Sequence, residues 1–468
     1  MSLQDNSGWV PRIEGRDGPI YRAIAEAIDA AIADGTLRPG QRLPTHRALA
    51  EALGLDLTTV TRAYAEARRR GLLDATVGRG TFIRGAAAAP AEDAAQGPVD
   101  LGMNLPPIPT EPALPALLQQ SLARLLGGDD VARRLTYRSG AGSAAERAAG
   151  AAWLRPTLGV VPVDRVLVTP GAQPALAAVF GALAARGDTV LTDPLTYPGL
   201  RGLAAQAGLL LRAVPGDALG MLPDALDAAC ADCAPKALYL VPTQHNPTAI
   251  TMPAERREAI AAIARRHGLP IVEDDAYGVL PSQPLAAIAS LAPALTFHVA
   301  TLSKVISPAL RVAFLVVPDA AWAARLTAAL RAQVLMASPL MTGLAAAWIG
   351  DGTAASVLGA IRRENVARQR IAGDLLPPGS FTGDPEGLHL WLRLPASWDR
   401  LHFAAQLRRQ GLAVVPSDAF AADPATAPIA AVRLSLGAAP NRAALRGALA
   451  TVAETLAMEA GAGFADIV

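Results

Sequence analysis

The sequence predicts two folded modules, a small helical module that ends in a β-hairpin and a large α/β module, joined by a linker. At 468 residues the chain is longer than one ordinary hydrophobic core supports. Residues 85 to 99 read GAAAAPAEDAAQGPV, which has no large apolar residue before the closing valine and is typical of a flexible linker. We therefore expect the small module at 17–84, the linker at 85–99 and the large module at 100–457.

Composition narrows the class of protein. A net charge of +1 excludes a globally basic nucleic-acid coat protein but permits a local basic patch. The only cysteines, Cys230 and Cys233, cannot form a disulfide framework, which favours the reducing cytoplasm. They are too few for a structural zinc site, so no metal is expected. The uncharged run 332–350 is interrupted by Pro339 and predicts a buried helix rather than a membrane span.

The small module has three helical segments. Ile20, Ile24, Ile28 and Ile32 recur every four residues, which predicts one helix with an apolar face, ending at Gly35. After the turn-rich run GTLRPGQRLP, Thr45 can cap a short helix that ends at the break made by Gly54. A third helix is expected from near Thr58 to Gly71.

These last two helices, joined by a tight turn, predict a helix-turn-helix, whose second helix can enter a major groove of DNA. The run LLDATVGRGTFI then predicts a β-hairpin wing. Residues 17–37 hold one arginine against four acids, whereas residues 38–84 hold nine arginines against four acids. The basic excess thus lies on the turn, the recognition helix and the wing, as contacts to DNA phosphates require.

The run from IYRAIAEAI at residue 20 to GRGTFI at residue 83 resembles the GntR-type winged helix-turn-helix. The resemblance implies that double-stranded DNA is contacted by Thr45, His46, Arg47, Thr58, Thr59, Thr61, Gly78, Arg79 and Gly80. The chain departs from the family at Asp56 and Leu57, where Ser or Thr followed by Arg is common. Bringing an acidic side chain close to a DNA phosphate is energetically unfavourable, and leucine cannot form the hydrogen bonds with which arginine recognises guanine. The operator sequence is therefore not predicted.

In the large module, polar residues follow apolar runs that alternate with helical stretches. The runs are VLVTP, TVLTDP, ALYLVP, LPIVEDD, FHVATLSK and VAFLVVP. Such alternation predicts a mostly parallel sheet, whose ligands bind at the carboxyl ends of the strands. Asn246, Asp274, Tyr277 and Lys304 all lie at such ends, and the backbone N–H groups that open the helix at Gly171 can bind an anion. His245, next to Asn246, can line the same pocket, while Asp275 points the opposite way.

Lys304 is unusual in its context. The chain has 42 basic residues, yet only Lys236 and Lys304 are lysines. Arginine keeps its proton at any cellular pH, whereas a desolvated lysine can lose its proton and form an imine with an aldehyde. An imine-forming lysine, an acid for a ring nitrogen, Asn and Tyr donors for a phenolate and a phosphate cup together predict a site for pyridoxal 5′-phosphate.

From about residue 100 to 455 the chain resembles the fold-type-I aminotransferases. The resemblance implies that Lys304 forms the aldimine, Asp274 holds the pyridine nitrogen, and Tyr277 and Asn246 donate to the ring oxygen. It further implies a stacking role for Tyr197 and a carboxylate-binding role for Arg433 of AVRLSLG. The phosphate would be held by Ala172, Gln173, Thr301, Ser303 and Arg311, with Tyr137 reaching the phosphate of a partner subunit. Ala249 of NPTA departs from the usual glycine.

The whole chain resembles the MocR subfamily of GntR-type transcription regulators. This resemblance implies a head-to-tail homodimer that binds pyridoxal phosphate, and in some members an amino acid or other amino compound, and so moves its DNA-reading heads. Either the cofactor alone or a carboxylate-bearing effector at Arg433 can be the signal. The complete set of site residues leaves an alternative function open, a working aminotransferase with an accessory DNA-binding domain.

Overall fold

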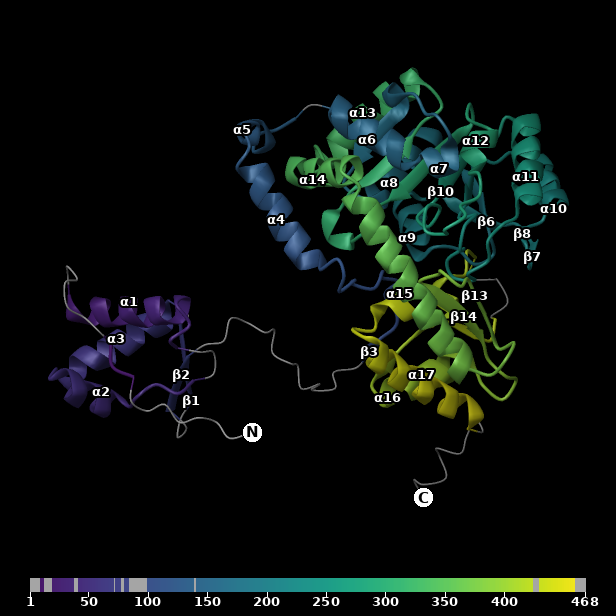
Figure 1. Ribbon diagram of the computed structural model, residues 1–468. Helices are drawn as coiled ribbons and strands as arrows, with labels where there is room; N and C mark the ends of the chain where they lie inside the picture. Colours follow the sequence, from purple (N-terminus) through teal and green to yellow (C-terminus); the bar gives the residue numbers. More distant parts are fainter. Residues whose placement is uncertain are drawn as a thin grey trace. The chain divides into compact units, whose positions relative to one another are not determined.

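The computed structural model divides into two compact units, Met1–Gly97 and Pro98–Val468 (Figure 1). It describes residues 9–11, 19–37, 41–70, 72–76, 80–83, 99–138, 140–423 and 429–458. Nearly all of the segment expected to be a linker therefore lies outside the described residues, as do Gly78 and Arg79 of the expected wing tip.

The small unit is a three-helix core with a hairpin. Its elements are α1 (Ile20–Ala33), α2 (His46–Leu53), α3 (Leu57–Arg69), β1 (Leu73–Thr76) and β2 (Gly80–Ile83), and the two strands pair antiparallel. Ile24 and Ile28 are fully buried, but Ile20 is 48% exposed, so the expected four-isoleucine stripe is wrong at its start. A four-residue repeat drifts by about 40° per step around a helix of 3.6 residues per turn, which carries the ends of the stripe off the buried face.

In the helix-turn-helix, a side chain caps the N-terminus of each of the two helices, α2 and α3. The Thr45 hydroxyl accepts the backbone N–H of Ala48 at 3.2 Å, as the sequence predicts for α2. Asp56 caps α3 in the same way, since Oδ1 accepts the N–H of Thr58 at 2.8 Å. The third helix begins at Leu57, next to the expected Thr58, and the acid that departs from the family pattern satisfies a helix end.

The large unit is built on a seven-stranded sheet. Its order is β4 (Val166–Thr169), β12 (Ala313–Val316), β11 (Thr296–Thr301), β10 (Ile271–Asp274), β9 (Ala237–Leu240), β5 (Thr189–Thr192) and β6 (Leu210–Ala213). Only β12 runs antiparallel to its neighbours. Five strands, β4, β9, β10, β11 and β12, are buried along their whole length. Helices on both faces explain why these strands read as continuous apolar runs.

Helices cover the sheet and connect it to a smaller lobe (Figure 1). Around the sheet lie α4 (Leu114–Leu126), α5 (Val131–Arg134), α6 (Ala144–Trp153), α7 (Arg155–Leu158), α8 (Ala172–Leu183), α9 (Pro198–Ala207), α10 (Pro223–Cys233), α11 (Ala254–His267), α12 (Ile288–Leu291), α13 (Ala320–Val334) and α14 (Pro339–Gly350). The long α15 (Thr353–Leu375) runs from this lobe into the smaller one, as Figure 1 shows.

The smaller lobe has a four-stranded sheet in the order β13 (Phe381–Gly383), β14 (His389–Arg393), β17 (Ala431–Ser435) and β16 (Val415–Pro416). Helices α16 (Arg400–Arg409) and α17 (Arg442–Ala457) pack on it, and β15 (Leu412–Ala413) pairs in parallel with β3 (Val99–Asp100). The residues just after the linker are thereby anchored in this lobe. A short hairpin, β7 (Gly216–Asp217) and β8 (Gly220–Met221), lies on the larger lobe.

The uncharged run at 332–350 does not form one helix. It holds the end of α13, a break, and α14, which begins at Pro339 because proline fits the first turn of a helix but not its interior. Among the described residues no single helix is long and apolar enough to cross a membrane. Together α14 and α15 reach the required length and hydropathy, but they meet at an 82° bend.

Candidate functional site

A cavity of about 470 Å³ opens where the larger lobe meets the smaller one, a volume typical of small-molecule sites. The sequence-predicted residues that line it are Ala172, Tyr197, Asn246, Asp274, Tyr277, Thr301, Lys304 and Arg433. Asp274 ends β10 and Thr301 ends β11, while Asn246 follows β9. Parallel strands thus bring these side chains to one edge of the sheet.

Lys304 is held as a nearly buried amine. Its Nζ donates to the backbone oxygen of Asn104 at 2.5 Å. Burial, and to a lesser degree the nearby Arg433, lower the pKa of Lys304 to about 8, while Asp274 opposes the shift. This lysine therefore supplies far more of the unprotonated, nucleophilic amine at neutral pH than an exposed lysine does.

Asp274 presents one carboxylate oxygen that has no partner. Oδ2 accepts the Tyr239 hydroxyl at 2.7 Å, whereas Oδ1 is buried and forms no hydrogen bond with any described residue. Burial raises the pKa of Asp274 to about 6. A cationic ring N–H is the kind of group that would satisfy Oδ1 and favour the ionised carboxylate.

Tyr277 belongs to a hydrogen-bonded network that sequence reasoning missed. The Asn104 amide Nδ2 donates to the Tyr277 hydroxyl oxygen at 2.9 Å and lies 3.0 Å from His389 Nδ1. His389 Nε2 lies 3.2 Å from the backbone oxygen of His245. Because that carbonyl can only accept, the His389 proton is on Nε2, and Nδ1 accepts from Asn104.

The network fixes the direction of the Tyr277 hydrogen. Its oxygen already accepts from Asn104, and the Asn104 Oδ1 is engaged by the Ser435 hydroxyl at 3.1 Å. The Tyr277 O–H is thus free to donate to a group in the cavity. Asn104 had no local signal, but His389 did, because it is a polar residue that directly precedes the apolar run LWL of the strand HLWLR.

Replacing His389 by phenylalanine is expected to lower the free energy of unfolding by about 2–4 kcal/mol, because the buried Asn104 amide and the His245 carbonyl both lose a partner. Affinity for pyridoxal phosphate should fall as well, since Asn104 no longer holds Tyr277. The matched change His402→Phe, on an 84% exposed side chain, should alter neither quantity. Thermal unfolding and cofactor titration measure both; equal effects of the two changes would contradict the positioning role of His389.

Arg433 lies at the other side of the cavity. One guanidinium nitrogen donates to Asn246 Oδ1 at 2.7 Å, the other donates to the backbone oxygen of Gly102, and Nε has no described partner. The guanidinium also lies 5.1 Å from the centre of the Phe420 ring. Arg433 is 6% exposed, so it is a pre-positioned, buried cation with unused hydrogen-bonding capacity.

The predicted phosphate ligands gather at the start of α8. The Thr301 hydroxyl donates to Ser303 Oγ at 3.0 Å, and Arg311 donates to the Pro170 backbone oxygen at 3.3 Å. Arg311 packs so tightly on Gly171 that a Cβ there would lie 2.7 Å from Nη2, and Gly171 has a φ of +106°. Glycine is thus required at this helix N-terminus, whose free N–H groups can bind an anion.

Some predicted residues do not reach the cavity. Gln173 Nε2 donates to the Gly199 backbone oxygen at 3.1 Å, and neither Gln173, Ser303 nor Arg311 lines the cavity wall. Tyr137 is 82% exposed and lines a different surface depression with Arg138.

The segments that flank the motif residues show two further features. Asp275 pairs with the buried His298, at 3.0 Å between Oδ2 and Nε2, and so faces away from the cavity. Ala249, in the position where glycine is usual, adopts a left-handed φ of +58°.

The described residues fit pyridoxal phosphate. An amine of lowered pKa, an unpartnered buried carboxylate oxygen and an anion-binding helix end line or adjoin one cavity of suitable size. In that order, these three groups match the aldehyde, the ring nitrogen and the phosphate of pyridoxal phosphate.

In the small unit, the residues expected to contact DNA lie on α2 and α3. Arg47, Thr58 and Thr61 are exposed, while Thr59 is half-buried. The Thr58 hydroxyl donates to Asp56 at 2.5 Å and that of Thr61 to the Leu57 backbone oxygen at 2.9 Å. Both hydroxyls can therefore accept from, but not readily donate to, a nucleic acid. His46 packs edge-on against Tyr64.

Two family models match the chain. Residues 98–452 match the family described as "Aminotransferase class I and II", and residues 20–83 match "Bacterial regulatory proteins, gntR family". Together these matches cover both units of the structure.

Curated relatives span both parts. The chain is 31% identical to the uncharacterized HTH-type transcriptional regulator YdeF of Bacillus subtilis, over 92% of each chain. It is 28% identical to the vitamin B6 salvage pathway transcriptional repressor PtsJ of Salmonella typhimurium, over 90% of this chain and 95% of that one. Among solved structures, LysN, an alpha-aminoadipate aminotransferase of Thermus thermophilus, superposes with a TM-score of 0.70 at 24% identity, covering 86% of this chain and 100% of that chain. The last likeness shows the fold.

Proposed function

Because this chain belongs to the MocR-type regulators, in which a gntR-family helix-turn-helix is fused to a class I and II aminotransferase domain, we propose that its large unit binds pyridoxal 5′-phosphate and thereby controls DNA binding. The chain is an HTH-type, DNA-binding transcription regulator with an aminotransferase-like domain. The observation that carries the proposal is the cavity that holds Lys304, with its pKa of about 8, and the unpartnered Oδ1 of Asp274.

In this proposal each residue has one task toward the cofactor. The bound cofactor supplies an aldehyde for covalent attachment and an electron-withdrawing ring. Lys304 provides the attacking amine, Asp274 keeps a ring nitrogen protonated, and Tyr277 donates to the ring oxygen, together with Asn246. Tyr197 covers one face of the ring. The phosphate is taken by the α8 N-terminus with Ala172, Gln173, Thr301, Ser303 and Arg311.

Arg433 is proposed to receive the carboxylate of an amino acid or related amino compound. Its Nε is without a described partner, and its contact to Asn246 can be exchanged for a stronger, charge-assisted pair. The relative PtsJ is named for the vitamin B6 salvage pathway, which supports the other version, in which the cofactor itself is the signal. Titrating amino compounds against the loaded protein separates the two.

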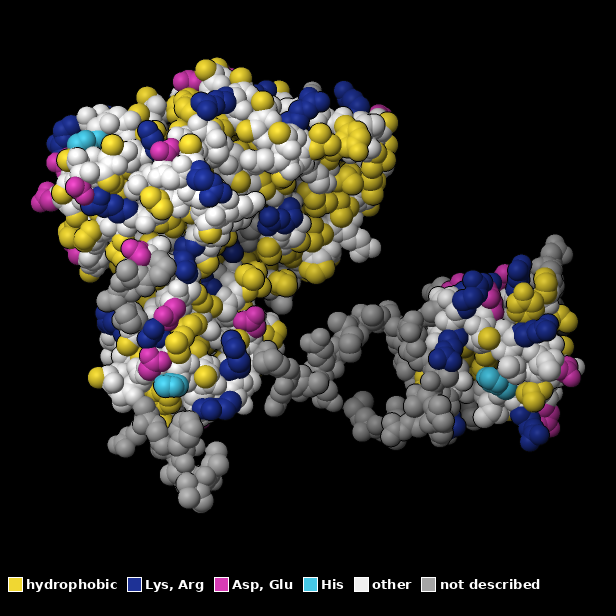
Figure 2. All heavy atoms as spheres, turned by 180° about the vertical axis from the view of Figure 1, so that it is seen from behind, with side chains coloured by type: hydrophobic (Ala, Val, Ile, Leu, Met, Phe, Trp, Pro, Cys, Tyr) yellow, Lys and Arg dark blue, Asp and Glu magenta, His cyan; other side chains and the backbone are white. Residues whose placement is uncertain are grey.

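The proposed coupling works through a head-to-tail homodimer. Figure 2 shows hydrophobic side chains gathered over the side of the large unit on which α4 and α5 lie. Leu126, Leu135 and Tyr137, which are 47%, 64% and 82% exposed, belong to this region. A partner subunit would cover them and bring its Tyr137 to the phosphate. A ligand then changes operator affinity only as far as it favours one dimer arrangement over another.

A second candidate function, a working aminotransferase, is favoured by the completeness of the site. The amine, the ring-nitrogen partner, the ring-oxygen donors and the carboxylate receptor all line the same cavity. Turnover of an amino acid with a keto acid at ordinary enzymatic rates, on the order of 1–1000 per second, would support it.

The test of the regulator is binding of the full-length protein to DNA upstream of its own and neighbouring genes, at one fixed salt concentration, with and without pyridoxal phosphate. Specific binding that changes with the cofactor is the expected result. Specific binding that is indifferent to the cofactor would contradict the proposed control, and fast transamination without specific binding would favour the enzyme.

Arg47→Ala is expected to weaken DNA binding by about tenfold and to reduce the salt dependence by about one phosphate contact, because an exposed arginine beside the turn is lost. Cofactor binding should not change. Arg22→Ala, in α1 of the same unit, is the matched control and should leave DNA affinity as it is. Fluorescence anisotropy over a range of salt measures both, and equal affinities of Arg47→Ala and wild type would disprove the assigned DNA-binding face.

A further inference from the structure

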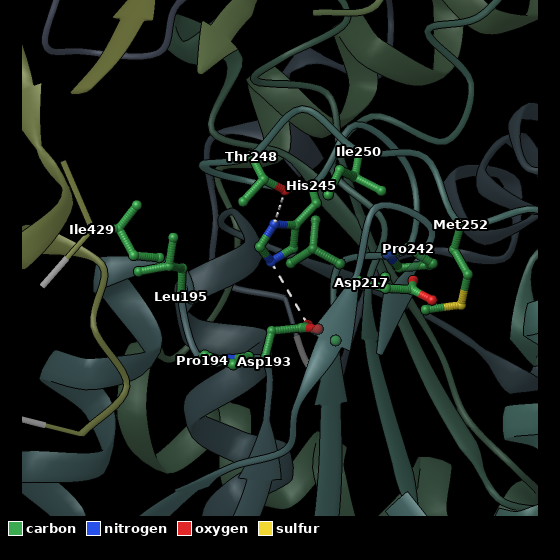
Figure 3. Close-up of a pocket in the computed structure, with 13 residues that line it drawn as sticks. Asp193, Pro194, Leu195, Asp217, Pro242, His245, Thr248, Ile250, Met252 and Ile429 are labelled. Carbon is green, nitrogen blue, oxygen red and sulfur yellow. Dashed lines mark hydrogen bonds and ion pairs between the residues drawn. The ribbon is translucent and has the colours of Figure 1, made fainter. Parts of the chain in front are cut away.

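A second cavity, of about 230 Å³, lies beside the cofactor cavity and shares the wall residue Val241 with it. Its other walls are the segment after β5, from Asp193 to Leu195, the segment after β9, the β7–β8 hairpin, and Ile429 of the smaller lobe. Figure 3 shows the His245 side chain pointing toward Asp193 within this lining. The sequence left open whether His245 lines the cofactor pocket or is only packed, and its ring lines this second cavity.

One buried polar atom in this cavity, His245 Nε2, lacks a hydrogen-bond partner among the described residues, and a carboxylate lies close to it. His245 Nδ1 lies 2.8 Å from the Thr248 hydroxyl, whereas Nε2 is buried and forms no hydrogen bond with the described residues. Nε2 lies 3.7 Å from Asp193 Oδ2, too far for a hydrogen bond (Figure 3). In the tautomer with the proton on Nδ1, Nε2 is an acceptor, so a donor placed in this gap can bond to both Nε2 and the Asp193 carboxylate.

Burial in this cavity disfavours the charged forms of both Asp193 and His245. Burial raises the pKa of Asp193 to about 7 and lowers the pKa of His245 to about 4. Each group is therefore pushed toward its neutral form because nothing nearby compensates a charge. A positive charge that carries N–H donors would reverse this effect at Asp193 and satisfy Nε2 at the same time.

The charged residues that line the cavity favour a cationic ligand over an anionic one. Besides Asp193, the only charged lining residue that the structure describes is Asp217, whose carboxylate is already paired with Arg256 at 3.0 Å. Neither lysine nor arginine is among the described lining residues. An anionic ligand would thus find no partner and would meet Asp193 directly, whereas a cation meets an unmatched carboxylate.

The rest of the wall is apolar. Leu195, Pro242, Ile250, Met252 and Ile429 line the cavity with hydrocarbon surface and have no side-chain group that could bind a second polar end. A ligand that fits therefore has one charged end and a short hydrocarbon tail. Burying such a tail is favourable at roughly 25 cal/mol per Å² of apolar surface.

We propose that this cavity binds a short, unbranched alkylammonium ion, with the ammonium between Asp193 Oδ2 and His245 Nε2 and the tail against Leu195, Ile250 and Met252. The site is separate from the amine-reactive Lys304 and goes beyond the proposed function. A ligand here would contact both lobes, since Ile429 belongs to the smaller one. That is the property by which a bound molecule can change the equilibrium between lobe arrangements.

The experiment is isothermal titration of the full-length, cofactor-loaded protein with n-butylammonium chloride, with 1-butanol and sodium butyrate as ligands of similar length. Butylammonium is expected to bind, and the alcohol and the carboxylate to bind at least about tenfold more weakly. Asp193→Asn should weaken butylammonium by about tenfold or more. This comparison of ligands uses the wild-type protein, so it does not depend on whether the variant folds.

A chemical treatment separates this site from the cofactor. Because an amine can also react at the cofactor aldehyde, the loaded wild-type protein is reduced with borohydride before a parallel titration and should keep the binding that Asp193→Asn loses. Circular dichroism checks that Asp193→Asn folds. Undiminished binding to Asp193→Asn, loss of all binding in the reduced protein, a preference for butyrate, or no butylammonium binding to wild type would each overturn the proposal.

Discussion

Lys304→Arg is expected to abolish covalent attachment of pyridoxal phosphate while leaving the fold intact. A pKa of about 8 makes roughly a tenth of the Lys304 amines unprotonated at pH 7, some hundreds of times more than at an ordinary lysine, whereas arginine has essentially no unprotonated form. Arginine keeps the charge and much of the length of the side chain, so the surrounding packing is largely retained. The loss should therefore be chemical rather than structural.

The measurement is the absorbance of the bound cofactor, together with borohydride reduction and mass spectrometry of the peptide that carries it. Lys236→Arg is the matched control, because Lys236 is the only other lysine and is exposed. It should retain the absorbance and the modified Lys304 peptide. A cofactor still covalently bound in Lys304→Arg would mean that another amine reacts, and the assignment of the site would be wrong.

Arg257→Met is expected to destabilise the large unit by about 3–5 kcal/mol, a large part of the 5–15 kcal/mol that holds a typical domain folded. Arg257 is 1% exposed. It donates to the backbone oxygens of Met252 at 2.9 Å, Ala286 at 3.0 Å and Pro242 at 3.1 Å, and to the Thr243 hydroxyl at 3.0 Å. Methionine fills similar space but removes these donors, although the Pro242 oxygen still accepts the Met252 N–H at 2.8 Å.

The same contacts connect Arg257 to the site. Pro242 and Thr243 lead directly to Asn246, so loss of Arg257 should also weaken cofactor binding. Urea unfolding followed by tryptophan fluorescence measures stability, and it reports mainly on the large unit, which holds five of the six tryptophans. Arg363→Met, on an exposed arginine of α15, should change stability by less than about 0.5 kcal/mol. Similar effects of both changes would show that Arg257 is not the structural centre inferred here.

Much of the architecture could be predicted because local patterns and chemistry agree. The apolar runs predict the strands of the large sheet, and the polar residues after them predict which side chains meet, since parallel strands end at one edge. The sequence also predicts that Thr45 caps the N-terminus of α2. What local patterns could not reveal were contacts between distant segments. Asn104 enters the site from the segment after the linker, 173 residues before the Tyr277 that it contacts.

The failures have equally specific causes. Ile20 lies at a helix end, where a four-residue repeat has rotated away from the core. Asp56 was weighed only as a DNA contact, although an acid before a helix is also a favourable cap. Sequence alone did not decide whether His245 shares the pocket of its neighbour Asn246, because adjacent residues in an irregular segment can face different cavities.

The contrast between an exposed Lys236 and a buried Lys304 makes the protein convenient for chemical labelling. Amine-reactive dyes need an accessible, unprotonated side chain, and of the two lysines only Lys236 is open to solvent. Both lysines lie in the large unit, so a lysine-directed dye leaves every side chain of the DNA-reading unit unmodified. Once the cofactor occupies Lys304, Lys236 is the one lysine side chain left to label, so a fluorophore can be placed there without any mutation and its response to added DNA followed in the native sequence.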